Sequence, residues 1–309
     1  MRDIKRHLPI IVMIAGVLVL VLVLSKRVAP VPVDEGKIRI TASFYPLYFF
    51  ASQIGGGFAD VANIIPAGVE PHDYELASQD IIRLEQSRLV ILNGGGFEPW
   101  AGDIRRTVDP AKTVVTDAGE GLTARMGEEG DAPIRDPHVW LSPRLAASMA
   151  DAILRGFVAA DPANRTEYEA NAVALKERLA DLDREYREGL AHCARSDFIT
   201  SHAAFGYLAA EYGLNHVSIA GLSPQQEPSP ATLAEVVRFA REHDIRYIFF
   251  ETMVSPRLAE TIAREIGAKT LVLDPIEGLT RDEEAVGKDY FTKMYTNLTN
   301  LKLALACTP

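Results

Sequence analysis

The sequence predicts an α/β fold in which two Rossmann-like βα lobes are joined by one long, rigid helix. In each half of the chain, short apolar runs alternate with helical patterns, which is typical of βα units around a parallel sheet. A continuous apolar stripe with helical spacing separates the two halves. The chain of 309 residues is long enough to give each lobe its own buried core.

The expected strands divide evenly between the two halves. Those of the first half are KIRITASF (37–44), VANIIP (61–66), RLVILN (88–93) and TVVTDA (113–118). Those of the second half are DFITS (197–201), HVSIA (216–220), RYIFFE (246–251) and KTLVLD (269–274). Helices are expected between the later strands, at ATLAEVVRFAREH (231–243) and PRLAETIAREIG (256–267).

The stripe between the halves indicates a single connecting helix. Its members lie three or four residues apart: Tyr168, Ala172, Leu175, Leu179, Leu182, Tyr186 and Leu190. Asp161 is expected as the N-cap, with Pro162 at the first helical position, so the helix should run from 161 to 192. At ~1.5 Å per residue it would extend for about 45 Å and reach from one lobe to the other.

The N-terminus lies outside this fold. A basic head precedes an uncharged apolar run from Leu8 to Leu24, which indicates an export signal or a membrane anchor. No clear cleavage site follows, and no cysteine is present there to carry a lipid, so an uncleaved anchor in the cytoplasmic membrane is favoured over a cleaved signal. Either way, the rest of the chain should work outside the cytoplasm, in the periplasm or at the cell surface.

The predicted domains follow from these observations. Residues 1–37 form the anchor or signal with its linker, 38–160 the N-terminal lobe, 161–192 the connecting helix and 193–309 the C-terminal lobe. The net charge of -10 argues against a general nucleic-acid surface and favours small cations as partners. The chain is expected to act as a monomer.

Three of the seven histidines lie where a strand or loop ends: His72 in VEPHDYE, His138 in RDPHVWL and His202 in TSHAAFGY. Open parallel sheets bind ligands outside the carboxyl ends of their strands. His202, Glu251 and Asp274 each follow a strand of the second half, so they should reach the same edge of that sheet. His72 and His138 would face them across the cleft between the lobes.

This set of side chains suits a divalent transition metal. Three neutral imidazoles and one carboxylate favour a borderline cation such as Zn²⁺. Four protein ligands would close the coordination sphere, and a closed site holds metal without hydrolysing anything. The alternative is an extracellular zinc-dependent hydrolase, which needs an open coordination position and a general base such as Glu251 or Glu277.

Two further segments are expected to be loops. LVILNGGGFEPW (89–100) lacks the lysine and the spacing of phosphate-binding loops, so its glycines indicate a tight turn that Glu98 and Trp100 help to shape. DAGEGLTARMGEEGDAPIRD (117–136) has the glycine and charge content of an exposed loop.

With these residues in view, the chain resembles the solute-binding proteins of zinc and manganese ABC importers. The resemblance covers nearly everything from about residue 38 to the end, in ordered blocks that include PAGVEPHDYELASQD, DPHVWLSP, TSHAAFGYLAAEYGL, FFETMVSPRLAETIAREIG and LVLDPIEGL. It implies a two-lobe fold with a rigid backbone helix, no enzymatic activity, and a permease partner in the membrane. It also implies metal held between the lobes by His72, His138, His202 and an acidic group in LDPIEG.

The acidic ligand remains open between two residues. Asp274 is favoured because it lies immediately at the strand end, and Glu277 is the alternative. Glu251 is expected to orient an imidazole through its free ring nitrogen. Zinc is favoured as the cargo because His202 supplies a third nitrogen and no negative charge; a manganese-preferring member of the family is the alternative.

Two features depart from the family pattern. Residues 119–136 are acidic but contain no histidine, where zinc members often carry a His/Asp-rich loop. The usual lipoprotein cysteine near the N-terminus is absent, so anchoring would fall to Leu8–Leu24. Because export places the protein in an oxidising compartment, Cys193 and Cys307 are expected to form a disulfide.

Overall fold

The computed structural model describes residues 36–129 and 132–308. The anchor expected at residues 8–24 lies outside the described residues. Among the helices in the described ranges, none is both long and apolar enough to cross a membrane. Residues 38–309 form one compact unit, so the domain boundaries expected at 160 and 193 stay predictions.

The first lobe is built on a parallel sheet with the strand order β2-β1-β3-β4. Its strands are β1 (Ile38–Ala42), β2 (Ala59–Asn63), β3 (Leu89–Leu92) and β4 (Val114–Asp117). Its helices are α2 (Tyr45–Gly55), α3 (Ser78–Gln86), α4 (Ala101–Thr107) and α5 (Pro143–Ala160). All four residues of β3 are buried, as expected for a central strand covered on both faces.

The second lobe repeats this plan with the strand order β10-β9-β7-β8, again parallel. Its strands are β7 (Asp197–Thr200), β8 (Asn215–Ser218), β9 (Tyr247–Phe250) and β10 (Lys269–Val272). Its helices are α7 (Gly206–Tyr212), α8 (Pro230–Glu242), α9 (Arg257–Ile266), α10 (Arg281–Ala285) and α11 (Tyr290–Ala304). The predicted α/β class and the eight predicted strands are therefore confirmed.

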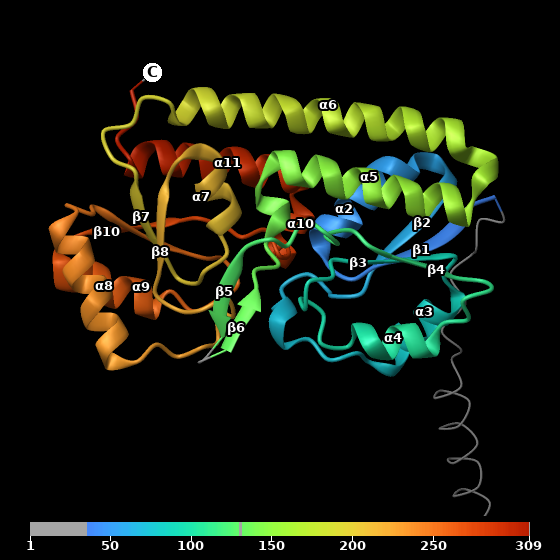
Figure 1. The fold of residues 1–309 in the computed structure, drawn as a ribbon, viewed down its shortest axis with the longest axis horizontal. Coiled ribbons are helices and arrows are strands. Elements are labelled where there is room, and N and C mark those ends of the chain that lie inside the picture. The colour runs from blue at the N-terminus through green and yellow to red at the C-terminus, as the bar shows by residue number, and fades with distance from the viewer. Residues whose placement is uncertain (1–35, 130–131, 309) are drawn as a thin grey trace, which may run out of the picture. The chain divides into compact units, whose positions relative to one another are not determined.

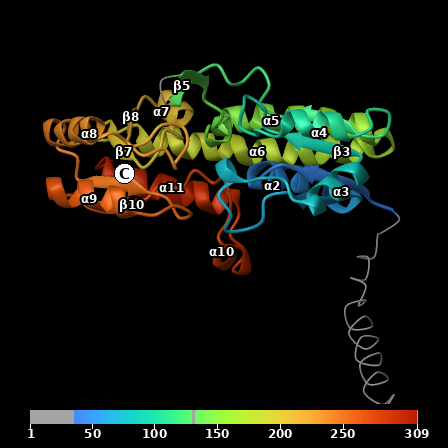
Figure 2. The same cartoon turned by 90° about the horizontal axis from the view of Figure 1, so that it is seen from below.

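The long helix α6 (Arg165–Leu190) links the two lobes. Every member of the predicted apolar stripe is buried, and the helix packs against α2 and α5 of the first lobe and against α7 and α11 of the second. Figure 1 shows it extending along both lobes, and Figure 2 shows the same arrangement from below.

The predicted cap is confirmed for a short 3₁₀ turn, and the α-helix begins later than predicted. Asp161 is the N-cap of the turn Pro162–Asn164, whose first residue is Pro162, and α6 follows at Arg165. Asp161 also ends α5, because its N–H donates to Phe157 O at 2.8 Å. The Asp161 carboxylate accepts hydrogen bonds from Asn164 Nδ2 and the Tyr168 hydroxyl, both at 2.7 Å. An Asp-Pro pair is equally suited to a helix start and to the corner between two helices.

The segment expected to be an exposed loop at 117–136 is partly regular. Strands β5 (Met126–Glu129) and β6 (Ala132–Arg135) form an antiparallel hairpin. Gly127 of the hairpin lies close to Leu222 of the second lobe. A Cβ atom at residue 127 would be 2.7 Å from Leu222 Cδ1. The Tyr207 hydroxyl accepts from Arg125 N at 3.1 Å and donates to Asp136 O at 3.0 Å, so the hairpin base is tied to α7.

The predicted disulfide between Cys193 and Cys307 is present, which confirms the pairing. It joins the segment after α6 to the segment after α11, across a sequence separation of 114 residues. The C-terminal helix is thereby covalently linked to the end of the connecting helix.

We expect the variant Cys193→Ser/Cys307→Ser to be less stable by about 2 to 5 kcal/mol, because the cross-link restricts a long loop of the unfolded chain. Urea unfolding of the wild type under oxidising and reducing conditions measures the same difference without substitution. A wild type whose midpoint is the same in both conditions would contradict this expectation, and the double variant should be insensitive to reductant.

Candidate metal centre

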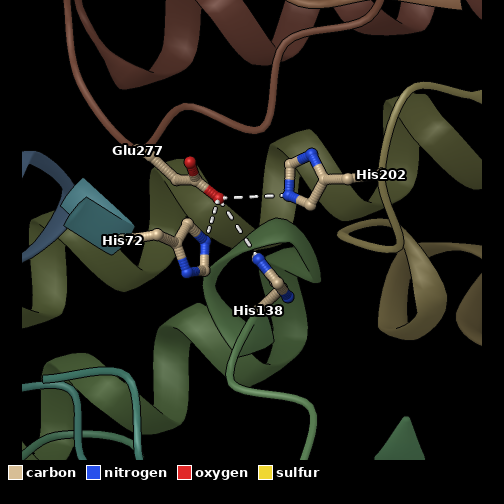
Figure 3. A group of neighbouring side chains, drawn as sticks. All are labelled: His72, His138, His202 and Glu277. Carbon is tan, nitrogen blue, oxygen red and sulfur yellow. Dashed lines mark hydrogen bonds and ion pairs between the residues drawn. The ribbon is translucent and has the colours of Figure 1, made fainter. Parts of the chain in front are cut away.

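Four polar side chains from both lobes meet inside the protein: His72, His138, His202 and Glu277 (Figure 3). One candidate ligand atom from each lies within 4.8 Å of the others. The Nε2 atoms of the three histidines lie 3.4, 3.2 and 3.4 Å from the same Oε1 of Glu277, in chain order. His138, His202 and Glu277 are almost completely buried, whereas His72 is 13% exposed.

These separations match the edges of a tetrahedral metal site. Ligand atoms ~2.0–2.1 Å from a tetrahedral Zn²⁺ lie about 3.3–3.4 Å from one another. Three buried atoms of the group, His138 Nε2, His202 Nε2 and Glu277 Oε2, have no hydrogen-bond partner. Buried polar atoms are costly to leave unpaired, so the two histidine nitrogens, which face Oε1 of Glu277, indicate a site arranged for a cation.

His72 is held by the loop that follows β2. It lies in the 3₁₀ turn Pro71–Asp73, and its backbone N–H donates to Glu70 Oε1 at 3.3 Å. The indole of Trp100 donates to Tyr74 O at 3.0 Å, two residues beyond the histidine. The turn is therefore fixed at both ends.

The glycine-rich segment after β3 supports the same histidine. Gly94–Gly96 all have positive φ, from 68° to 92°, which only glycine adopts readily. The buried carboxylate of Glu98 closes this turn by accepting the N–H groups of Asn93 at 2.6 Å and Gly94 at 3.0 Å. The ring of Phe97 then packs edge-on against His72, with 5.2 Å between ring centroids.

His138 is oriented by a carboxylate two residues before it. Its Nδ1 donates to Asp136 Oδ1 at 2.8 Å, and its backbone N–H donates to the same oxygen at 3.0 Å. Because Nδ1 carries the proton, Nε2 is the nitrogen left to face the group. Nearby, Trp140 Nε1 donates to Pro275 O of the second lobe at 2.7 Å, which joins the two lobes beside the site.

His202 is oriented in the same way from the second lobe. It lies just after β7, and its Nδ1 donates to Glu251 Oε1 at 2.7 Å. The Thr200 hydroxyl donates to His202 O at 2.6 Å, which fixes the backbone as well. Glu251, which follows β9 and is 4% exposed, thus orients an imidazole and does not join the four-residue group.

The structure does not bring Asp274 into the group, so the choice of Asp274 as the acidic member is corrected to Glu277. Asp274 Oδ2 lies 2.6 Å from Nζ of the buried Lys293, and Oδ1 accepts the Ile276 N–H at 2.7 Å. Strand β10 ends at Val272, and the chain then turns so that Glu277, three residues after Asp274, points at the histidines.

Sequence reasoning also missed the residues that hold this arrangement. Asp136 could have been found from its position in RDPHVWL, two residues before a candidate ligand. Lys293 and Asn297 are polar residues on the otherwise apolar buried face of α11, four residues apart. Such positions signal a buried polar partner, here the backbone and carboxylate of Asp274.

The charges of the metal-free site follow from this geometry. Burial opposes a charged imidazole, but Asp136 and Glu277 outweigh burial and raise the pKa of His138. Burial also opposes a charged imidazole at His202, but Glu251 and Glu277 outweigh burial and raise its pKa well above the usual value. Burial also opposes ionisation of Glu277, yet the three histidines hold its pKa well below the usual range.

Two α/β lobes on one long helix, with three oriented imidazoles and one carboxylate closed between them, define a metal-binding protein of the solute-binding class. The group would complete a four-coordinate metal with protein atoms alone, whereas a catalytic zinc site keeps a position for water.

Comparison with known proteins identifies the family. The family described as the periplasmic component A of the zinc-uptake complex, ZnuA, matches residues 40–304, and this chain belongs to it. The high-affinity zinc uptake system protein ZnuA of Bacillus subtilis is 40% identical over 280 residues, which cover 87% of this chain and 88% of that protein. The chain is thus a component of a zinc-uptake system, with a role in transport and not in catalysis.

Two further relatives support the assignment. The zinc-binding protein AdcA of Streptococcus pyogenes is 35% identical over 289 residues; these cover 87% of this chain but 56% of AdcA, so the chain spans about half the length of that relative. The crystal structure of the Zn(II)-bound ZnuA-like domain of Streptococcus pneumoniae AdcA is similar with a TM-score of 0.76 and 38% identity, covering 87% of this chain and 99% of that domain.

We expect Zn²⁺ binding to release protons near pH 7, because the imidazoles of His138 and His202 must be neutral to bind metal. Since the pKa of each is raised in the metal-free protein, affinity should keep rising with pH above the ordinary histidine range near ~6.5 and should fall below it. Calorimetric titration in buffers of different ionisation enthalpy counts the protons.

The matched variant for this experiment is Glu251→Gln, which removes the carboxylate that raises the pKa of His202. It should release fewer protons than the wild type. Equal binding enthalpies in all buffers, together with a constant affinity between about pH 6 and 8, would show that the imidazoles are already neutral.

Proposed function

We propose that this chain captures Zn²⁺ outside the cytoplasm with His72, His138, His202 and Glu277, and delivers it to an ABC importer permease. The observation that carries the proposal is the convergence of three Nε2 atoms on one buried carboxylate oxygen at 3.2–3.4 Å. The zinc cargo is supported by the donor set of three nitrogens and one oxygen, which suits a borderline cation better than Mn²⁺. The permease is the membrane partner that a component of an uptake complex requires.

The metal preference can be tested at His202. In His202→Glu the group would hold two imidazoles and two carboxylates, a harder donor set that is better matched to Mn²⁺. We expect Zn²⁺ affinity to fall by more than about a hundredfold, beyond the 10–100-fold typical of losing a residue that only supports a ligand. Mn²⁺ affinity should fall less, so the ratio of Zn²⁺ to Mn²⁺ affinity is the quantity to measure by competition titration.

The new carboxylate would also face Glu251, and this would lower the affinity for both metals. The ratio of the Zn²⁺ and Mn²⁺ affinities is therefore the appropriate readout. His192→Glu is the matched control, since His192 is exposed and lies in the segment between α6 and β7, outside the four-residue group. An unchanged Zn²⁺/Mn²⁺ ratio in His202→Glu would remove His202 from the ligand set. A wild type that prefers Mn²⁺ in the same titration would overturn the zinc assignment.

We also propose that residues 8–24 keep the protein on the outer face of the cytoplasmic membrane as a monomer. The support is the uncharged apolar run itself, the basic residues on both sides of it and the absence of a lipid-carrying cysteine. Membrane fractionation should find the chain in the membrane pellet, released by detergent but not by high salt. A soluble mature product that begins near Ala29 or Val33 would show cleavage instead.

A further inference from the structure

The residue before Glu277 has a strained backbone. Ile276 has a φ of +58°, in the left-handed region. A β-branched residue there is sterically unfavourable and persists only where its surroundings enforce it. Ile276 is completely buried, and the next residue supplies the oxygen on which the three histidines converge.

The side chain of Asp274 enforces this turn. Its Oδ1 accepts the Ile276 N–H at 2.7 Å. Asn297 of α11 fixes the Asp274 backbone from both sides: Oδ1 accepts the Asp274 N–H at 2.9 Å, and Nδ2 donates to the Asp274 carbonyl at 2.7 Å. The carbonyl of Pro275 accepts the Trp140 indole of the first lobe at 2.7 Å. Hydrogen bonds thus hold Asp274, Pro275 and Ile276, the three residues before Glu277.

The Asp274 carboxylate is in turn held by the Thr252 hydroxyl, which donates to Oδ2 at 2.5 Å, and by one buried ammonium group. Lys293 Nζ lies 2.6 Å from Asp274 Oδ2 and 2.9 Å from Glu283 Oε2, and its side chain is 4% exposed. Burying an ammonium group is costly unless it is paired, so this position of α11 is selected for the charge and not for packing. The ion pairs of Lys293 are with Asp274, three residues before Glu277, and with Glu283, which accepts the Thr280 N–H at 3.0 Å. Only Asp274 also bonds to the strained residue Ile276.

We infer that Lys293 is a positioning residue for metal binding: through Asp274 it keeps Ile276 in the left-handed conformation, so that Glu277 faces the three histidines before the ion arrives. This inference rests on the proposed function. The rival explanation is a purely structural ion-pair network that holds α10 and α11 in place and affects stability alone.

The test combines loss of the ammonium group with relief of the strain. Lys293→Met should weaken Zn²⁺ binding about tenfold, because the bound state must then supply the unfavourable conformation of Ile276. Ile276→Gly removes that cost, since glycine adopts positive φ freely. We expect Ile276→Gly to restore most of the lost affinity in the Lys293→Met background. Affinities are measured on the full-length purified chain by competition with a chromophoric chelator, and thermal melting checks the fold.

Ala306→Gly is the matched control, because Ala306 also has a positive φ, +52°, but lies beyond α11 near the C-terminus. It should restore no affinity to Lys293→Met. Unchanged affinity in Lys293→Met, or equal effects of Ile276→Gly and Ala306→Gly in that background, would overturn the inference in favour of the structural network.

If Lys293→Met does not melt cooperatively, Lys293→Met/Glu283→Gln is used in its place. It removes one charge of each sign and leaves the net buried charge of this cluster unchanged, and the same outcomes apply. The wild-type titration in the same series reports separately on the proposed function. A wild type without Zn²⁺ binding defeats the function itself, whereas the differences among variants decide the role of Lys293.

Discussion

The convergence of three imidazole nitrogens on Oε1 of Glu277 is the constraint on which the rest of the structure depends. Two of the four side chains belong to the first lobe and two to the second, so a shift of one lobe by an ångström would break the tetrahedral spacing. The architecture removes that freedom. Helix α6 packs against helices of both lobes, the Trp140 indole bonds to Pro275 O, and the Tyr290 hydroxyl donates to Trp140 O at 2.6 Å. These contacts make the distance between the lobes a property of the packed core and not of a flexible hinge.

Within that frame, local contacts orient each of the four side chains. His138 and His202 donate Nδ1 protons to buried carboxylates, and this leaves Nε2 directed at the group. His72 relies on a turn fixed at Glu70 and on the aromatic edge of Phe97. Glu277 relies on a strained turn held by Asp274. The acidic side chain has the most backbone support, because the residue before it, Ile276, has an unfavourable positive φ.

The fold and part of the site were predictable from the sequence, for physical reasons. Strands and the connecting helix were predictable because burial imposes a period on the sequence, as the stripe from Tyr168 to Leu190 shows. The histidines were predictable because each follows a strand or loop end. The same rule favoured Asp274 over Glu277. It failed because the end of a strand predicts that a Cα atom lies at the sheet edge, but not the direction of its side chain. Asp274 instead binds Thr252, the Ile276 N–H and Lys293, about twenty residues later on α11, and such a long-range ion pair leaves no local pattern.

The charge of the site favours a cation between the lobes. The carboxylates of Asp136, Glu251 and Glu277 outweigh burial and raise the pKa of His138 and His202, which favours protonated imidazoles when no metal is bound. Zn²⁺ competes with those protons for the histidine nitrogens and places its two positive charges beside the same carboxylates. Either cation therefore balances part of the negative charge of the carboxylates. An additional carboxylate in place of His202 would upset this balance as well as the donor set. The supporting acids Asp136 and Glu251 thus have two roles, because they orient the imidazoles and also balance the charge of whatever cation, proton or metal, lies between the lobes.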